Sequence, residues 1–143
     1  YEIYMGDWSS DVCSSDQDEA CMLQWSFWAM TEVEKSLLAI YMQRAELPPG
    51  SAVEKYFRER SPKDPAIEQA ALKALEHPLS VLNNHLASRQ YLLGDSFTLA
   101  DLNVASVLSM GLAAKFDFGA HPNVQQWLTR CVSRPAARPP KKS

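Results

Sequence analysis

The chain has 143 residues, 46% of them hydrophobic, which is enough for one domain with its own core. Its formal net charge is −3, and its 14 basic residues are scattered, which argues against a nucleic-acid partner because such surfaces need a basic patch or stripe. No apolar run reaches transmembrane length, so we expect no membrane partner.

The first 16 residues differ in character from the rest. Asp7 to Asp16 reads DWSSDVCSSD, which is one translation frame of a common sequencing-adapter oligonucleotide. We therefore interpret residues 1–16 as an adapter-derived, disordered scar and exclude them from fold reasoning. A genuine Ser/Asp-rich tail is the alternative, and it would be disordered as well. The scar interpretation implies that the natural N-terminal part is missing and that Gln17 enters mid-protein.

Removing this segment changes what the composition says. The scar holds four acidic residues and no basic ones, so 13 acidic residues remain against 14 basic ones and the charge gives no clue to a partner. Cys21 and Cys131 remain, without a C-x-x-C spacing, which favours a reduced, cytoplasmic protein. Residues 138–143 form a short basic tail that we expect to be disordered.

Two helical segments are predicted in the first third of the chain. Glu19–Glu46 lacks internal Gly and Pro, and the sequence Pro48-Pro49-Gly50 ends it. Residues 51–60 predict a short, polar connecting turn or helix. The long first segment carries tryptophan and other apolar residues at helical spacing, so we expect it to pack along the core.

The next helix is predicted to run from Asp64 to about Arg89. Asp64 has the character of an N-cap, and Pro65 suits the first helical position, where a missing N–H costs nothing. Leucines alternate at spacings of three and four and predict a buried seam, at Leu72, Leu75, Leu79, Leu82 and Leu86. The seam continues across Pro78, so we expect one helix with a bend rather than two helices.

The most informative feature is the helix start at Thr98, which predicts a helix to about Ala114. Thr98 is a favourable N-cap, and Asp101, three residues later, can accept a hydrogen bond from the Thr98 N–H, as in a capping box. Phe97 and Leu102 have the spacing of a hydrophobic staple. The helix is small or apolar on nearly all sides, so we expect it to be buried at the centre of the domain.

A final helix is predicted from His121 to about Ser133, with Trp127 on its inward face. No segment reads convincingly as a strand. We therefore predict one domain, residues 17–137, that is all-α: a helical bundle around a buried central helix that starts at Thr98.

Catalytic chemistry is hard to find in these residues. No nucleophile elbow or phosphate-binding loop is present, and His77, His85 and His121 lack the spacing of metal ligands. Cys131 lies on an amphipathic helix and is interpreted as a buried structural thiol. The spacing of Asp101 from its cap explains it as a structural residue. We predict no catalytic residue and no metal site.

Three motifs together resemble one family. GDSFTLADL at residues 94–102, Pro122 with Trp127, and Arg134-Pro135-Ala136 stand at the offsets typical of the C-terminal helical domain of glutathione transferases. The resemblance covers nearly everything after residue 16 and is of bacterial type. It implies an all-α bundle with two long antiparallel helices around a buried central one. It also implies that the family's N-terminal thioredoxin-like domain is missing.

The resemblance carries expectations about chemistry. In the family, the thiol-activating residue and nearly all glutathione contacts come from the thioredoxin-like domain. We therefore expect glutathione to be a co-substrate of the intact protein and not to be bound by this chain alone. The intact protein would conjugate glutathione to a small hydrophobic electrophile. Family behaviour also implies a homodimer of the intact protein.

Met22, Trp25, Trp28 and Glu32 are the candidate substrate-binding residues, because the resemblance implies that the first helix of this domain lines the electrophile cleft. The alternative is that both tryptophans fill the core or a dimer interface. Glu32 can equally pair with Lys35, three residues on.

A second function class remains open. The resemblance extends to non-catalytic, glutathione-transferase-like helical modules that serve protein–protein assembly in translation factors and synthetase complexes. A stress-response homologue that kept the fold and lost activity is a third. The fold alone does not separate these classes, whereas the upstream coding sequence does.

Overall fold

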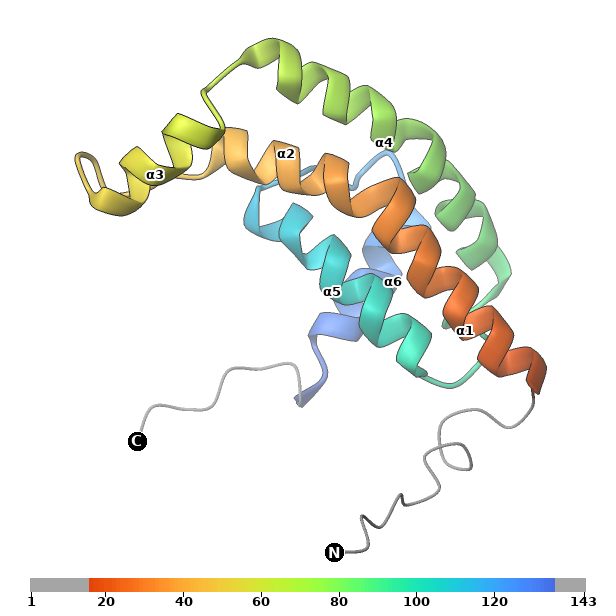
Figure 1. Ribbon diagram of the computed structural model, residues 1–143. Coiled ribbons are helices and arrows are strands. Elements are labelled where there is room, and N and C mark those ends of the chain that lie inside the picture. The colour runs from red at the N-terminus through yellow and green to blue at the C-terminus, as the bar shows by residue number, and fades with distance from the viewer. Residues whose placement is uncertain (1–15, 136–143) are drawn as a thin grey trace, which may run out of the picture.

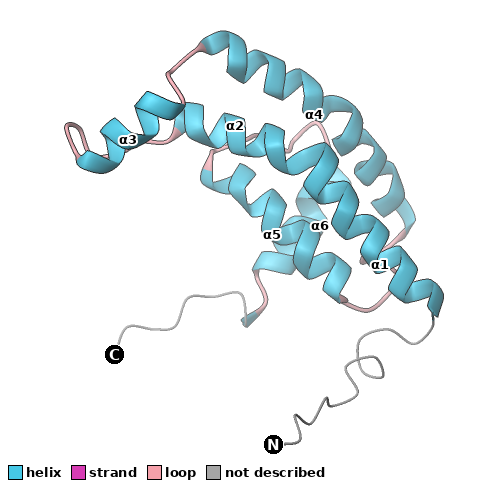
Figure 2. Ribbon diagram, in the orientation of Figure 1, coloured by secondary structure: helices cyan, strands magenta, loops and turns pink. Residues whose placement is uncertain are grey.

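The structure is a computed structural model that describes residues 16–135 (Figures 1 and 2). The predicted scar, apart from its last residue, and the basic tail 138–143 lie outside the described residues. The elements of the described part are α1 (Asp16–Trp28), a π-helical segment η1 (Ala29–Glu34), α2 (Lys35–Arg44), α3 (Ala52–Arg60), α4 (Pro65–His85), a 3₁₀ turn η2 (Leu86–Ser88), α5 (Leu99–Ala113) and α6 (Pro122–Val132). All are helical, so the all-α prediction is confirmed.

Elements α1, η1 and α2 follow one another without a break and form one rod (Figure 1), as the absence of Gly and Pro predicts. The π-helical segment is not predicted by the sequence pattern. Ala29, Val33 and Leu37 are all buried at successive spacings of four. In an α-helix each four-residue step overshoots a full turn by about 40°. The wider π-helical turn keeps these side chains on one side of the rod, against the core.

Helix α3 projects from the end of the rod and buries none of its residues (Figure 1). Its cap is Ser51, whose hydroxyl accepts a hydrogen bond from the Glu54 N–H at 3.1 Å. Arg58 ties it to the rod by donating to the carbonyls of Met42 and Ala45 at 2.8 and 2.9 Å. The short polar segment is therefore a helix, and hydrogen bonds from Arg58 hold it to the rod.

Helix α4 begins at the expected cap, where Oδ1 of Asp64 accepts a hydrogen bond from the Ala66 N–H at 2.9 Å. The leucine seam faces the core, with Leu72 half-buried and Leu75, Leu79, Leu82 and Leu86 buried. Pro78 lies inside α4 without ending it, which confirms one helix rather than two. The helix curves along α2, its main neighbour (Figure 1).

Helix α5 is the central helix that the sequence predicts, because it contacts α1, η1, α2 and α6. One side of α5, including Ala100, Val104 and Leu108, is fully buried. The expectation of burial on nearly all sides is wrong for the opposite side, where Leu99 and Leu102 are 38% and 50% exposed. The surrounding helices cover one side of α5, and its apolar composition continues beyond that cover.

The two residues of the expected hydrophobic staple differ in burial. Phe97 is half-buried and Leu102 is 50% exposed, and both border one hollow beside α6. The Phe97 ring stands edge-to-face against Tyr91, with centroids 5.8 Å apart, and the Arg134 guanidinium lies 3.8 Å above it. The arginine of the C-terminal motif thereby closes over the residue that precedes the central helix.

The end of α5 is a Schellman-type turn whose left-handed residue is a lysine. The Phe116 N–H donates to the Gly111 carbonyl at 2.8 Å, and the Lys115 N–H donates to the Leu112 carbonyl at 3.0 Å. Lys115 has φ 54°, the left-handed region that favours glycine. The left-handed conformation of Lys115 therefore lowers the stability of the folded protein.

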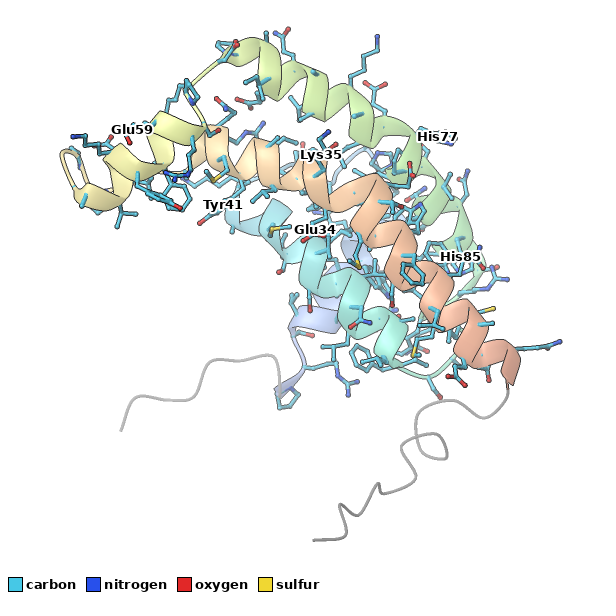
Figure 3. The ribbon with its side chains drawn as sticks, viewed as in Figure 1. Glu34, Lys35, Tyr41, Glu59, His77 and His85 are labelled. Carbon is cyan, nitrogen blue, oxygen red and sulfur yellow. The ribbon has the colours of Figure 1, made fainter. Side chains whose placement is uncertain are left out.

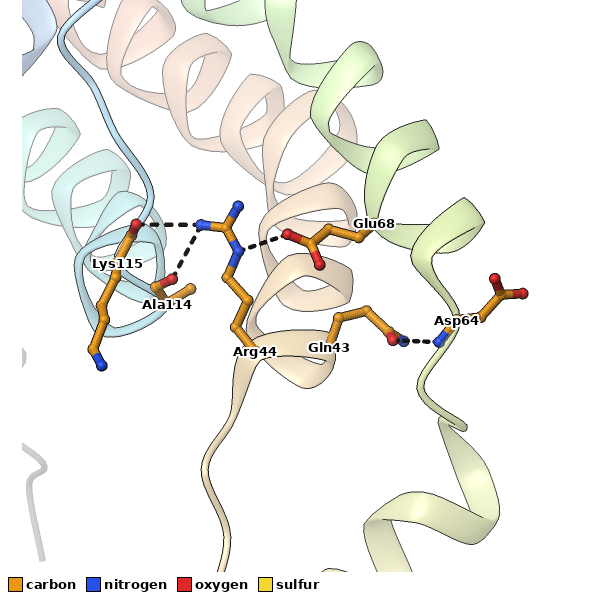
Figure 4. A network of polar contacts seen from close by, with 6 residues as sticks. All are labelled: Gln43, Arg44, Asp64, Glu68, Ala114 and Lys115. Carbon is orange, nitrogen blue, oxygen red and sulfur yellow. Dashed lines mark hydrogen bonds and ion pairs between the residues drawn. The ribbon is translucent and has the colours of Figure 1, made fainter.

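Arg44 of α2 joins three helices at the same end of the bundle (Figure 4). Its Nε pairs with Oε1 of Glu68 in α4 at 2.7 Å. Its Nη1 donates to the carbonyls of Ala114 and Lys115, which follow α5, at 3.3 and 3.2 Å. The guanidinium satisfies carbonyls that the helix end leaves without intrahelical partners.

We expect Lys115→Gly to stabilise the protein by about 0.5–1 kcal/mol, because a side chain in the left-handed region costs about 1–2 kcal/mol and glycine returns part of this as unfolded-state entropy. The Lys115 side chain is 82% exposed and its ion pair with Glu46 is 3.4 Å long, so little is lost. Ala113→Gly, in the last helical turn, is the matched control and should lower the Tm. A lower Tm for both variants would contradict the assignment of strain to Lys115.

Candidate functional site

The candidate aromatic pair lies on α1, and one of its rings reaches α4. The rings of Trp25 and Trp28 stand edge-to-face with centroids 5.2 Å apart, and the Trp25 ring lies 4.5 Å from the His85 ring. Figure 3 labels His85 near the end of α4. Nε2 of His85 donates to the Leu92 carbonyl at 2.8 Å, which fixes the imidazole beside Trp25. Both tryptophans are half-buried and pack against the core. The structure therefore gives both rings packing partners inside the chain.

The other two candidates of the first helix differ in exposure. Met22 is half-buried and packs against the core cluster. Glu32 is exposed, and it forms no ion pair with Lys35 in the part of the chain that the structure describes. The structure brings Trp25 and Trp28 together and places Glu32 at the solvent, so the four candidates do not form one cluster.

A second side of the rod, away from the two tryptophans, is apolar and exposed, and the sequence does not predict this exposure. Leu23, Phe27 and Met30 are 47%, 61% and 59% exposed. They are four and three residues apart, so they share one side of the helix. That spacing is visible in the sequence, but the spacing alone does not show that this side is exposed. Exposed apolar groups of this kind mark binding surfaces.

Helix α5 adjoins this side of the rod. Nδ2 of Asn103 in α5 donates to Oγ of Ser26 in α1 at 2.9 Å, so the two helices meet there. The exposed Leu99 lies one turn before Asn103. Four exposed apolar residues near this bond form what we call the α1–α5 face: Leu23, Phe27, Met30 and Leu99.

Asp101 is fully buried, and both of its carboxylate oxygens are used. Oδ2 accepts hydrogen bonds from the N–H and the hydroxyl of Thr98, both at 2.9 Å, which is the carboxylate half of the predicted clasp. Oδ1 accepts from the Leu92 N–H at 2.9 Å and from Nε1 of Trp127 at 2.8 Å. The local sequence pattern does not predict these two contacts, since Leu92 and Trp127 lie 9 and 26 residues from Asp101. The carboxylate ties the start of α5 to the preceding loop and to α6, which leaves it no free lone pair directed at a substrate.

The remaining candidate for covalent chemistry is Cys131. Burial, with a smaller contribution from the Asp101 carboxylate, raises the pKa of the Cys131 thiol from 9.0 to about 12. The thiol is therefore protonated at neutral pH and is a poor nucleophile.

Among residues 16–135, no group of three or more His, Cys, Asp or Glu side chains is arranged to hold a metal ion. None of the described helices combines the length and apolar character that a membrane crossing needs.

Comparison with known proteins gives a consistent picture. The family model described as glutathione S-transferase, C-terminal domain, matches residues 29–135. Elongation factor 1-gamma 2 of Oryza sativa subsp. japonica is 33% identical over 115 residues, which cover 78% of this chain and 24% of the relative. The glutathione S-transferase-like protein LUC7 of a Fusarium species is 39% identical over 75 residues, which cover 50% of this chain and 34% of the relative. The chain thus spans about a quarter to a third of these relatives.

Solved structures share the fold. A possible glutathione S-transferase from Rhodopseudomonas palustris superposes with a TM-score of 0.73 at 21% identity, covering 98% of this chain and 59% of that one. A glutathione transferase from Burkholderia graminis, solved with two glutathione molecules bound per subunit, gives 0.68 at 19% identity, covering 92% and 54%. The helical architecture and the family-model match agree, and this chain belongs to the glutathione S-transferase C-terminal domain family.

Proposed function

We propose that this domain is the electrophile-side domain of a glutathione transferase-like protein and that the α1–α5 face receives the hydrophobic electrophile. The exposure of Leu23, Phe27 and Met30 carries the proposal, because neighbouring large apolar side chains left about half exposed favour an apolar ligand. The four candidates from the sequence lie on the same rod but outside this face: Met22, Trp25, Trp28 and Glu32. In this proposal they support the rod and do not form the main electrophile contact.

The proposal assigns no catalytic residue to this chain. The Cys131 thiol is protonated, and the Asp101 carboxylate is bonded on both oxygens. Glutathione is the co-substrate of the intact protein, and a thioredoxin-like domain would hold it and activate its sulfur. The intact protein is proposed to be a cytoplasmic homodimer. This division of labour predicts that the present chain binds neither glutathione nor electrophile tightly by itself.

Steady-state kinetics with 1-chloro-2,4-dinitrobenzene test this assignment. The 143-residue chain alone is expected to leave conjugation at the uncatalysed rate. In a protein that joins this domain to its thioredoxin-like partner, Phe27→Ser should raise the KM for the electrophile by about tenfold, the loss of one aromatic contact, with the KM for glutathione unchanged. Val81→Ser, at an exposed apolar position of α4, is the control and should leave both constants unchanged.

Two results would argue against the proposal. The first is conjugation by the 143-residue chain alone at well above the background rate, which would place catalytic residues in this domain. The second is a raised KM for the electrophile in Trp28→Ser with an unchanged KM in Phe27→Ser. That result would place the electrophile site at the tryptophan pair.

A second candidate function is a non-catalytic helical module for protein–protein assembly. The similarity to proteins named elongation factor 1-gamma, at 33% and 34% identity over 78% of this chain, favours it. The α1–α5 face would then bind a protein surface. The upstream reading frame distinguishes the two candidates. A thioredoxin-like domain with an early Ser, Cys or Tyr supports the enzyme, and a domain of another fold supports the module.

A further inference from the structure

Asn103 is a polar residue at the junction of the two helices that form the α1–α5 face. Its Nδ2 donates one hydrogen to Oγ of Ser26 at 2.9 Å. The Ser26 hydroxyl in turn donates its own hydrogen to the Met22 carbonyl at 2.9 Å. Because the serine proton is already used, Ser26 can act towards Asn103 only as an acceptor. The pair therefore fixes the Asn103 side chain with its Nδ2 against α1.

This bond leaves part of the Asn103 amide unused. The second Nδ2–H and the Oδ1 have no partner among the residues that the structure describes, and the side chain is half-buried. Leu99 lies one turn before Asn103, and Met30 lies one turn after Ser26, so exposed apolar side chains border the junction on both helices. A donor next to apolar surface binds an acceptor more strongly than it would in open water.

We infer that Asn103 is a specificity-determining residue of the α1–α5 face, where its free N–H donates to an acceptor oxygen on the bound electrophile. The face then selects apolar compounds that carry a carbonyl over hydrocarbons of the same shape. Neither its four apolar residues nor the Ser26–Asn103 pair carries an ionisable group, so the face offers a charged ligand no opposite charge. The inference rests on the proposed function of this face, and Ser26 lowers the entropic cost of the new bond by holding the amide in place.

A matched pair of probes tests it. Acetophenone and α-methylstyrene have nearly the same shape and differ in a C=O against a C=CH₂ group. Each is titrated into the isotopically labelled 143-residue chain, and NMR follows the Met30 methyl and the Asn103 side-chain amide. Both probes should shift the Met30 methyl, and acetophenone alone should shift the Asn103 amide. Acetophenone should bind about 2- to 10-fold more tightly, the contribution of one neutral hydrogen bond.

Variants separate the amide from the apolar surface. Asn103→Leu, of similar size, should remove the preference for acetophenone and keep the binding of α-methylstyrene. Asn84→Leu, which removes an exposed amide from α4, is the control and should keep the preference. If Asn103→Leu does not fold, the response of the wild-type Asn103 amide decides.

The outcomes separate the inference from the function on which it rests. Equal affinities for the two probes, or a preference that survives in Asn103→Leu, overturn the role of Asn103, while shifts at Met30 leave the proposed function standing. No shift at Met30 with either probe overturns the proposed function of the face, and the inference with it.

Discussion

Asp101→Ala is expected to lower the free energy of unfolding by about 3–5 kcal/mol, well beyond the roughly 1–2 kcal/mol of a lost helix cap. The carboxylate accepts hydrogen bonds from the backbone N–H groups of Leu92 and Thr98 and from Nε1 of Trp127. Each donor left buried without a partner costs about 1–3 kcal/mol. Urea unfolding followed by circular dichroism measures the change.

Two control variants separate the contribution of the helix cap from that of the contacts to the loop and α6. Thr98→Ala removes the hydroxyl that donates to the same carboxylate and keeps the Leu92, Thr98 and Trp127 N–H groups paired with it, so it should cost about 1 kcal/mol. Asp95→Ala, an exposed carboxylate in the preceding loop, should change stability by less than about 0.5 kcal/mol. If Asp101→Ala costs no more than Thr98→Ala, Asp101 is a cap alone and does not hold α6 and the loop.

Gly111→Ala is expected to destabilise the protein by about 1–3 kcal/mol, the reverse of the usual effect of this change inside a helix. An added Cβ would lie 2.8 Å from Cζ of Phe118 and 3.3 Å from Cδ2 of Leu37. The Phe118 ring is buried and stands edge-to-face against Phe116, with centroids 4.8 Å apart, so it has little room to move. Thermal unfolding should show a lower Tm.

A double mutant tests the cause of this loss. Phe118→Leu removes the ring atoms that would meet the new methyl group, so its cost and that of Gly111→Ala should not add. The pair should be more stable than the sum of the single changes implies, as expected for two residues in contact. A higher Tm for Gly111→Ala alone would show that the ring yields freely and that α5 is not tightly packed at this point.

Local sequence signals were enough to place the helix boundaries. The caps at Asp64 and Thr98 act on their own first turns, so their spacing is readable without tertiary structure. The leucine seam of α4 was predictable because one periodic pattern runs through the whole helix, and Pro78 does not change its phase. These features depend on residues no more than one turn apart.

The missed features depend on residues far apart in the sequence. Trp127 reaches the Asp101 carboxylate from 26 residues away, and nothing in the local pattern of either helix announces the bond. The start of α6 was predicted at His121, but its capping partner was not. Oδ1 of Asn83 in α4 accepts from the Asn123 N–H at 3.0 Å, whereas His121 makes no side-chain cap bond. Such caps from another helix become visible once the helices have docked.

The candidate site was the least predictable part. A tryptophan pair drew attention because aromatic side chains suit an apolar ligand, but the sequence did not show that His85 of α4 lies against Trp25. A helical wheel with one fixed period also fails along this rod, because η1 changes the phase between α1 and α2. The exposure of Phe27 and Met30 depends on which sides of the rod the other helices cover, and the sequence pattern does not give that.

Ligand mapping by two-dimensional NMR tests most directly whether the α1–α5 face, and not the tryptophan pair, receives an apolar ligand. The labelled 143-residue chain is titrated with α-methylstyrene, and backbone, methyl and indole signals are followed together. The account predicts shifts at Leu23, Phe27 and Met30, with the indole N–H signals of Trp25 and Trp28 unchanged. Shifts of those indole signals, with Phe27 and Met30 unchanged, would contradict it.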